Sequence, residues 1–267
     1  MVTVLVTGAE SFAGRWLLPA LGVDGREVRY GSSASLEGCA AAYYLGDGDV
    51  AAAERFAAAA AAAAVGRIIY LGGIVPSDPL RASAALRRRL EVGAVLRSGS
   101  VPAIELRAGL IVGQGNPSWE VVHALASRLP VMLLSSWLDG IGQPVAIRDV
   151  VAALVGALRV PIERSIVWDL PGPQPMTARE ILEETAAALG RPRPPEIPVP
   201  VSSPWLSARW AQLVTRARWE VVRDLIHDLG AGQRAHDDGF WELIGHPLRQ
   251  DFPAAARAAV VDKRLRG

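Results

Sequence analysis

Short apolar runs alternate with longer amphipathic or alanine-rich stretches along most of the chain. An apolar run bounded by glycine or polar residues is typical of a strand buried in a parallel sheet, and an apolar stripe with helical spacing is typical of a packed helix. The predicted strands are 2–6, 27–30, 41–45, 67–71, 103–106 and 165–170, and the predicted helices are about 12–20, 50–64, 81–97, 117–128, 148–158 and 177–189. Because the two kinds alternate, we predict an α/β fold with a doubly wound parallel sheet.

The pattern changes after Gly172, where strands no longer alternate with helices. Thr177 and Glu180 have the spacing of a capping box that opens a helix. Residues 190–204 are proline-rich and predict an extended connector, and helical stretches follow at about 205–229, 238–244 and 253–263. We therefore predict a sheet domain over 1–172, with 114–140 contributing to a substrate pocket, and a smaller, mainly helical substrate lobe over 173–267.

Composition narrows the setting in which the chain works. Its 267 residues, 51% of them hydrophobic, suffice for a large core, and a net charge of +1 gives no electrostatic case for nucleic acid or an acidic membrane as partner. The single cysteine, Cys39, excludes an internal disulfide. Together with an N-terminus that enters a strand directly, this favours a cytoplasmic protein acting on a small molecule, with a homodimer as a further possibility.

The first loop joins an apolar strand directly to an amphipathic helix, as in the βαβ units that bind dinucleotides. Gly8 and Gly14 hold the outer positions of its glycine pattern, but Ser11 takes the middle position and Glu10 stands beside it. A helix N-terminus attracts phosphate through its free N–H groups, and a carboxylate there opposes a pyrophosphate. The loop therefore indicates the fold more clearly than the cofactor.

Several segments in order along the chain resemble the short-chain dehydrogenase/reductases. These are the loop TGAESFAG, AYYL at 42–45, VGRIIYLGG at 65–73, LRAG at 106–109 with GQG at 113–115, QPVAIRDV at 143–150, and the stretch from Ile197 to Trp210. The resemblance is to the atypical, extended NAD(P)-binding branch, which includes NmrA-like proteins and relatives of an accessory subunit of respiratory complex I. It spans nearly the whole chain and implies a Rossmann-like fold.

The catalytic residues that the resemblance implies are missing. Reductases of this family use a Tyr-x-x-x-Lys pair, in which the lysine lowers the pKa of the tyrosine and holds the nicotinamide ribose. The only lysine here is Lys263, and the family alignment places Ala85 and Arg89 at the two positions. Arginine can hydrogen-bond a ribose but cannot exchange protons near neutral pH. The family also has a serine at the end of its fifth strand, and Gly72 or Gly73 stands at that position here.

The expected cofactor groove is also altered. The turn after Tyr30 has no carboxylate for an adenosine 2′-hydroxyl, and the short spacing between Gly31 and Ala41 leaves out one strand of the family. Asp47 and Asp49 end a strand on the expected nicotinamide side. We therefore expect a sheet shortened by one strand and no cofactor, with NADP or NAD as the alternative. The residues of a degenerate cofactor site would be Gly8, Glu10, Ser11, Phe12, Gly14 and Arg89.

Candidate acid and base groups are Asp47, Asp49, Glu120 and His123, since carboxylates and imidazole in a cleft can carry protons. Three of them also have a structural interpretation: Asp47 and Asp49 as a Gly-Asp turn in which Asp49 caps the alanine-rich helix, and His123 as a core residue. By analogy with the family, the substrate pocket would be formed by Gly73, Ile74, Gln114, Asn116, Trp119 and Trp137. The histidines lack metal-ligand spacing, so no metal site is expected.

These observations lead to a hypothesis of a non-redox enzyme on a reductase scaffold. It would catalyse the cyclisation or isomerisation of an apolar metabolite, or an elimination reaction on it, without NAD(P). Secondary metabolism is the suggested setting. One alternative is an NAD(P)H-dependent oxidoreductase whose proton comes from a non-standard donor. The other is a non-catalytic NmrA-like regulator or subunit.

Overall fold

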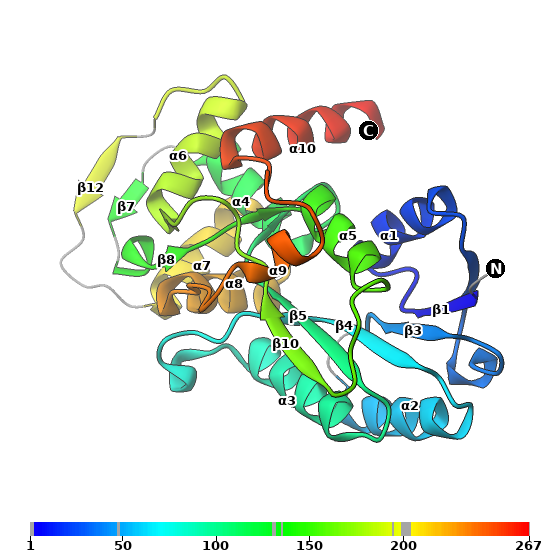
Figure 1. The fold of residues 1–267 in the computed structure, drawn as a ribbon. Helices are drawn as coiled ribbons and strands as arrows, with labels where there is room; N and C mark the ends of the chain where they lie inside the picture. Colours follow the sequence, from blue (N-terminus) through cyan, green and yellow to red (C-terminus); the bar gives the residue numbers. More distant parts are fainter. Residues whose placement is uncertain are drawn as a thin grey trace.

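The structure is a computed structural model that describes residues 3–46, 49–129, 132–134, 136–193, 195–198 and 204–266. Its centre is a six-stranded sheet, with helices on both faces and a group of further helices beyond the carboxyl ends of the strands (Figure 1). The sheet consists of β1 (Thr3–Thr7), β2 (Glu27–Tyr30), β3 (Ala41–Tyr44), β4 (Arg67–Gly73), β5 (Ala103–Ala108) and β10 (Ile166–Asp169). Every neighbouring pair is parallel, in the order β10-β5-β4-β3-β1-β2. The predicted doubly wound parallel sheet is confirmed.

Successive strand residues face opposite sides of the sheet, and each side has its own core. Val4 and Val6 pack with α1 (Phe12–Val23) and α5 (Ile147–Gly156), whereas Leu5 packs with α2 (Val50–Ala62) and α3 (Ala84–Ser98). Figure 1 shows α1 and α5 on one face and α2 and α3 on the other. Both faces are thus covered, which is why the strands read as nearly continuous apolar runs.

The sheet ends at β2, as the short spacing after Gly31 predicts. Between β2 and β3 the chain forms only a short 3₁₀ helix, Ser33–Ser35, and β3 pairs directly with β1. Gly31 has a φ of +147°, a conformation that side chains rarely adopt. The chain therefore returns to the centre of the sheet without building the additional strand of the family.

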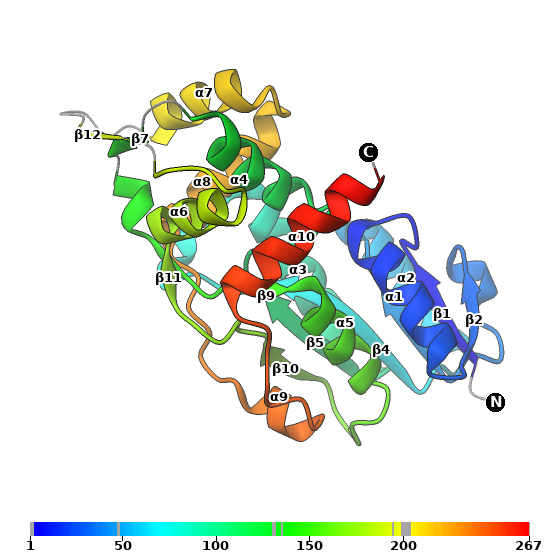
Figure 2. The ribbon, with the colours of Figure 1, turned by 90° about the horizontal axis from the view of Figure 1, so that it is seen from above.

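A second group of helices packs beyond the carboxyl ends of the strands, and Figure 2 shows it to one side of the sheet. It contains α4 (Pro117–Arg128), α6 (Ala178–Ala188), α7 (Pro204–Thr215), α8 (Trp219–Ala231) and α10 (Phe252–Arg266). The remaining short elements are β6 (Ile111–Val112), β7 (Met132–Leu134), β8 (Ile141–Gly142), β9 (Val145–Ala146), β11 (Met176–Thr177), β12 (Glu196–Pro198), α9 (Gly239–Leu243) and the 3₁₀ helices Pro79–Arg81 and Ser136–Asp139. Because α4 shares a core with helices after residue 173, this part of the predicted 114–140 segment packs with the C-terminal helices.

Two details of the C-terminal region differ from the sequence prediction. The stretch 205–229 is two helices rather than one, because Arg216 takes a left-handed φ of +58° that breaks the helical ladder. In the predicted connector 190–204, Glu196–Pro198 pairs in parallel with Met132–Leu134. This pairing joins segments distant in sequence, which no local pattern reveals.

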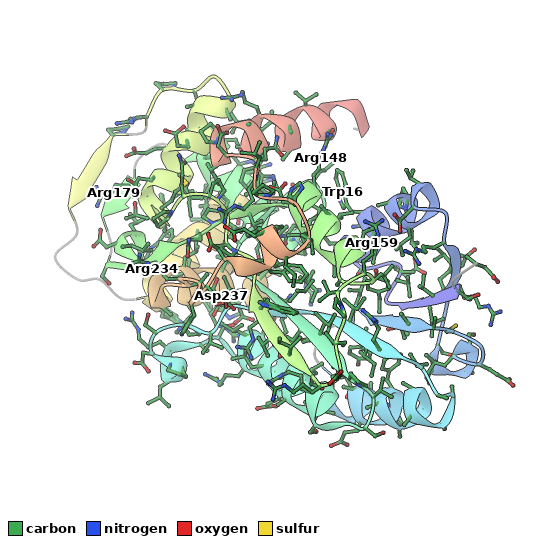
Figure 3. All side chains as sticks on the ribbon, in the orientation of Figure 1. Trp16, Arg148, Arg159, Arg179, Arg234 and Asp237 are labelled. Carbon is green, nitrogen blue, oxygen red and sulfur yellow. The ribbon has the colours of Figure 1, made fainter. Side chains whose placement is uncertain are left out.

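Ion pairs and hydrogen bonds fasten the C-terminal region and the helices to the sheet domain. Asp149 at the start of α5 accepts a hydrogen bond from Gln250 N at 2.9 Å and contacts His246 Nε2 at 2.8 Å. Arg159, labelled in Figure 3, forms an ion pair with Asp24 that links the segment after α5 to the end of α1. Asp149 therefore joins the start of α5 to the segment before α10, which is a structural role.

The capping box at α6 gives a prediction about stability and pH. Glu180 Oε2 accepts hydrogen bonds from Thr177 N at 2.7 Å and Thr177 Oγ1 at 2.8 Å, and these bonds lower the pKa of Glu180 below its ordinary value. A lowered folded-state pKa contributes stability above the unfolded pKa that is lost as pH falls through the folded pKa. We expect Thr177→Ala to lower the free energy of unfolding by about 1 kcal/mol at neutral pH, and the difference to shrink in acid. Denaturation across pH tests this, with Thr177→Ser as the control that retains the hydroxyl.

Candidate active site

A cavity of about 500 Å³ lies at the carboxyl ends of β1, β3, β4 and β5. One wall is the start of α1, formed by Ser11, Phe12 and Ala13. The floor comes from the strand ends and the loops that follow them: Leu45, Gly46, Leu71, Gly73 and Ala108 to Ile111. The opposite walls are α3, the start of α4 and one face of α8. This is the crevice in which open α/β sheets bind their ligands.

The glycine loop places the N-terminus of α1 against this cavity. Gly8 has a φ of +69°, and a Cβ on it would lie 2.4 Å from Leu45 O, so β1 and β3 approach closely here. A Cβ on Gly14 would meet Gly8 O at 2.5 Å. Ser11 caps the helix by accepting a hydrogen bond from Gly14 N at 3.1 Å. The loop thus keeps the helix start close to the strand ends.

Glu10 does not line the groove that it was expected to make acidic. Its side chain is exposed and is not among the residues that line the cavity, whereas its neighbours Ser11 and Phe12 do line it. The reason is local, because Ser11 takes the cap position and the helix begins at Phe12. The start of the first helical turn, whose N–H groups have no partners within the helix, therefore lines the cavity, and Glu10 does not.

Helix α3 brings Ala85 and Arg89 to the same cavity, the two positions that the family alignment assigns to tyrosine and lysine. The helix carries neither a tyrosine nor a lysine. Tyr70, on the neighbouring strand β4, donates from its hydroxyl to Arg89 O at 2.9 Å, and burial raises the pKa of this phenol to about 12. Tyr70 is 1% exposed and belongs to the core beneath α3. Arg89 thus places a permanent positive charge at the cavity.

The polar wall opposite comes from α8, which the sequence interpretation passed over. Glu220, Asp224 and Asp228 all line the cavity at four-residue spacing, one helical face. Asp224 is paired with Arg223 at 2.8 Å. The spacing was visible in the sequence, but it is equally typical of a solvated helix face.

Asp228 stands apart from the other two carboxylates in its environment. Its Oδ1 accepts a hydrogen bond from Ser83 N and its Oδ2 accepts one from Ser83 Oγ, both at 2.9 Å. Burial raises the pKa of Asp228 above its ordinary value, more than the Ser83 hydrogen bonds and the charge of Arg89 lower it, while the charge of Asp224 raises it further. A carboxyl group that holds its proton at higher pH is suited to acid catalysis.

The predicted acid and base residues lie elsewhere. Asp47 falls outside the described residues. Asp49 is exposed and caps α2 through Ala52 N at 3.1 Å, outside the main cavity. Glu120 and His123 line a separate cavity of about 450 Å³ between α4 and the α7–α8 turn. The structure therefore does not bring the three described candidates, Asp49, Glu120 and His123, together around one substrate in the main cavity.

Of the predicted substrate residues, Gly73 and Asn116 line the main cavity. Asn116 also caps α4 and donates from Nδ2 to Ile111 O at 2.6 Å, so it fixes the loop beside the cavity. Ile74 and Trp119 are buried in the protein interior, 0% and 1% exposed. Trp137 and Gln114 also lie outside the main cavity. Trp137 lines a third cavity, against α8. The backbone oxygen of Gln114 accepts a hydrogen bond from the indole of Trp16, which is labelled in Figure 3.

Two other kinds of site are not seen in the part of the chain that the structure describes. No group of three His, Cys, Asp or Glu side chains there could hold a metal ion. Of the helices among those residues, none combines the length and the apolar character needed to cross a membrane.

Comparison with known proteins gives matches in structure but not in sequence. No family model matches the chain, and no curated protein matches it. Among solved structures, the triphenylmethane reductase of Citrobacter sp. has a TM-score of 0.73 at 16% identity, over 97% of this chain and 99% of its own. An NAD-dependent NDP-hexosamine 5,6-dehydratase of tunicamycin biosynthesis has a TM-score of 0.71 at 13% identity, over 100% and 99%. A short-chain dehydrogenase/reductase superfamily protein of Agrobacterium tumefaciens with bound NAD has a TM-score of 0.67 at 17% identity, over 99% and 98%.

The chain therefore has the NAD(P)-binding Rossmann fold of these solved structures, over 98–99% of their length. The expectation of a cofactor-independent, non-redox enzyme is corrected by the same comparison, because structures of this fold hold NADP(H) or NAD. The physical argument behind that expectation also loses its basis at Glu10 and Asp49, which do not face the cavity.

Proposed function

We propose that this protein is an NAD(P)H-dependent reductase acting on a small, largely apolar substrate. The observation that carries the proposal is the continuity of the main cavity, which runs from the N-terminus of α1, past Arg89, to the face of α8. A dinucleotide and a substrate can therefore meet in one space at the carboxyl ends of the strands.

The residues at the α1 end fit a dinucleotide. The N–H groups of Phe12 and Ala13 suit a pyrophosphate because a helix N-terminus favours negative charge. Arg89 suits a ribose hydroxyl or a phosphate, and Leu71, Ala108 and Ile111 offer an apolar surface for a nicotinamide ring. When bound, the reduced nicotinamide supplies a hydride; the protein's part is to hold and orient the two reactants.

The other end of the cavity favours an apolar substrate. Leu86, Leu110, Val221, Leu225 and Leu229 line it, together with a few polar groups. Apolar walls with a small number of placed polar groups are typical of small-molecule sites. Triphenylmethane dyes are a suitable first panel of acceptors, because a reductase of this fold acts on them.

The turn after β2 favours NADPH over NADH. Residues 31–35 read Gly-Ser-Ser-Ala-Ser and carry no carboxylate to bind a ribose 2′-hydroxyl or to repel a 2′-phosphate. Arg29 lies beside it and donates to Glu37 O at 2.9 Å.

A titration tests the proposed function directly. We expect NADPH to bind with a dissociation constant between about 1 μM and 1 mM, as enzymes hold their substrates, and NADH to bind more weakly. Calorimetry gives the two constants, and loss of reduced-nicotinamide absorbance with a panel of apolar acceptors gives turnover. Absence of binding by either cofactor at about 1 mM would overturn the proposal. Binding without turnover of any acceptor would instead favour a non-catalytic regulator.

A further inference from the structure

The cavity lacks the phenol and ammonium groups that the family uses for proton transfer, yet carboxyl groups of α8 line it, among them the half-buried Asp228. Ala85 leaves the tyrosine position on α3 without a hydroxyl. Asp228 of α8 lines the same cavity and is hydrogen-bonded to Ser83, two residues before Ala85. A carboxyl group from another helix therefore stands next to the segment that would have carried the phenol.

We infer that Asp228 is the proton donor of this reductase, acting on a substrate whose reduction leaves negative charge on oxygen, such as a ketone or an enone. This inference rests on the proposed function and adds the residue that completes its chemistry.

The step balances with groups at the cavity and one named co-reactant, the reduced dinucleotide. The carbonyl carbon of a ketone, or the conjugate carbon of an enone, gains a C–H bond with the hydrogen and electron pair that the reduced dinucleotide gives up, so the substrate is reduced and the dinucleotide oxidised. In a ketone the C=O π pair moves onto the oxygen; in an enone the C=C π pair forms the new double bond of the enolate and the C=O π pair moves onto the oxygen. That oxygen takes the proton of Asp228, and the O–H bonding pair stays on the carboxylate. Water then returns a proton to Asp228.

Ser83 is placed to stabilise the carboxylate that this step produces. Its N–H and Oγ–H each donate to one carboxylate oxygen at 2.9 Å, while its Oγ also accepts from Leu86 N at 3.0 Å as the cap of α3. Hydrogen bonds to the charged form lower the pKa, and burial raises it. For Asp228 the effect of burial is the larger, so its pKa lies above its ordinary value, and the Ser83 hydrogen bonds stabilise the carboxylate that proton release leaves.

The other charged groups near Asp228 agree with this role. On its own helix, Asp224 disfavours a second negative charge, and Arg89 from α3 favours it. Asp224 is already paired with Arg223, and Arg89 cannot release a proton near neutral pH. Asp228 is thus a half-buried acid at the cavity, and its pKa is raised above the ordinary value.

Replacing the carboxyl group tests the inference. We expect Asp228→Asn to lower kcat by about 10²–10⁴-fold, the usual contribution of a general acid, while the Kd of NADPH stays within about threefold of the wild-type value. The wild-type rate should fall as pH rises through the raised pKa, and this limb should be absent in Asp228→Asn. Asp238→Asn, an exposed carboxylate paired with Arg249 outside the cavity, is the matched control and should behave as wild type.

A readout without turnover checks the same group. Because the folded-state pKa of Asp228 is raised, the folded protein binds the proton more tightly than the unfolded chain. Wild-type stability should therefore fall relative to Asp228→Asn as pH rises from the unfolded to the folded pKa. Should Asp228→Asn fail to fold, Ser83→Ala keeps the carboxyl group and removes one stabilising donor, and it should move the descending limb of the rate profile to higher pH.

The outcomes separate the inference from the proposed function. Wild-type protein that binds no dinucleotide overturns the proposed function. Wild-type protein that binds NADPH and reduces a carbonyl acceptor, with an Asp228→Asn variant of the same rate and the same pH limb, overturns the role of Asp228 alone. A loss of rate in Asp228→Asn with an unchanged Kd and a lost pH limb supports it.

Discussion

Replacing Glu105 by alanine should lower the free energy of unfolding by about 3–5 kcal/mol, a large part of the roughly 5–15 kcal/mol that holds a domain folded. Glu105 lies on β5, its side chain is 1% exposed, and it is paired with Arg97 at 2.7 Å and Arg107 at 2.9 Å. The carboxylate fills space against Gly72 and Gly93, where a Cβ would lie 2.7 and 2.6 Å from its oxygens. The substitution leaves two arginines without their anion and a void between β4, β5 and α3. Chemical denaturation measures the change.

Two further variants test this prediction: one separates the charge of Glu105 from its packing, and the other removes an exposed carboxylate for comparison. Glu105→Gln keeps the volume and removes the charge, and should be less destabilising than the alanine variant. Glu27→Ala removes an exposed carboxylate 3.6 Å from Arg29 and should cost less than about 1 kcal/mol. An equally small loss in Glu105→Ala would contradict the argument, since it would mean that water replaces the carboxylate at no cost.

Introducing a carboxylate at Ser11 should weaken NADPH binding by about 100-fold, or about 2.8 kcal/mol. Ser11 lines the cavity at the start of α1, where the proposed pyrophosphate lies, and two charges 4 Å apart at an effective dielectric of 20 interact by about 4 kcal/mol. Aspartate is as good a helix cap as serine, so Ser11→Asp should fold normally. Calorimetric titration gives the affinity, and a thermal melt verifies the fold.

Glu10→Gln is the matched control, because it changes charge one residue away on a side chain that does not reach the cavity. We expect its NADPH affinity to stay within about threefold of the wild-type value, since an exposed charge is largely screened. A large gain in NADPH affinity for Glu10→Gln, or an unchanged NADPH affinity for Ser11→Asp, would mean that the pyrophosphate of the dinucleotide does not lie at the start of α1.

The strands could be predicted from the chain to within a few residues because burial on both faces forces continuous apolar runs, as in Val4 to Val6 and Ile68 to Leu71. The absence of one strand of the family could also be predicted from the sequence, since the stretch between Gly31 and Ala41 is too short to hold a further strand and its connections. The break at Arg216 was not, because a left-handed residue within an amphipathic pattern leaves no mark on its period.

The site was harder to predict because it depends on directions rather than on residue types. Glu10 and Ser11 are neighbours, yet only the second faces the cavity, since the helix cap falls at Ser11. Trp119 and His123 both lie on α4, which was predicted to contribute to the pocket. Trp119 is in the core, however, and His123 lines a different cavity. A helical face in the sequence does not say which neighbour it meets.

By itself, the sequence determined the parallel sheet, its shortened edge and the loss of the tyrosine and lysine, because these depend on local pattern and on which residue types are present. Only the tertiary structure places Asp228, the acid that we infer to be the proton donor, at the cavity beside Ser83. Ser83 and Asp228 are 145 residues apart in sequence, and they meet because α8 packs across the carboxyl ends of the strands beside α3. The desolvation that raises the pKa of Asp228 exists only after that packing has formed.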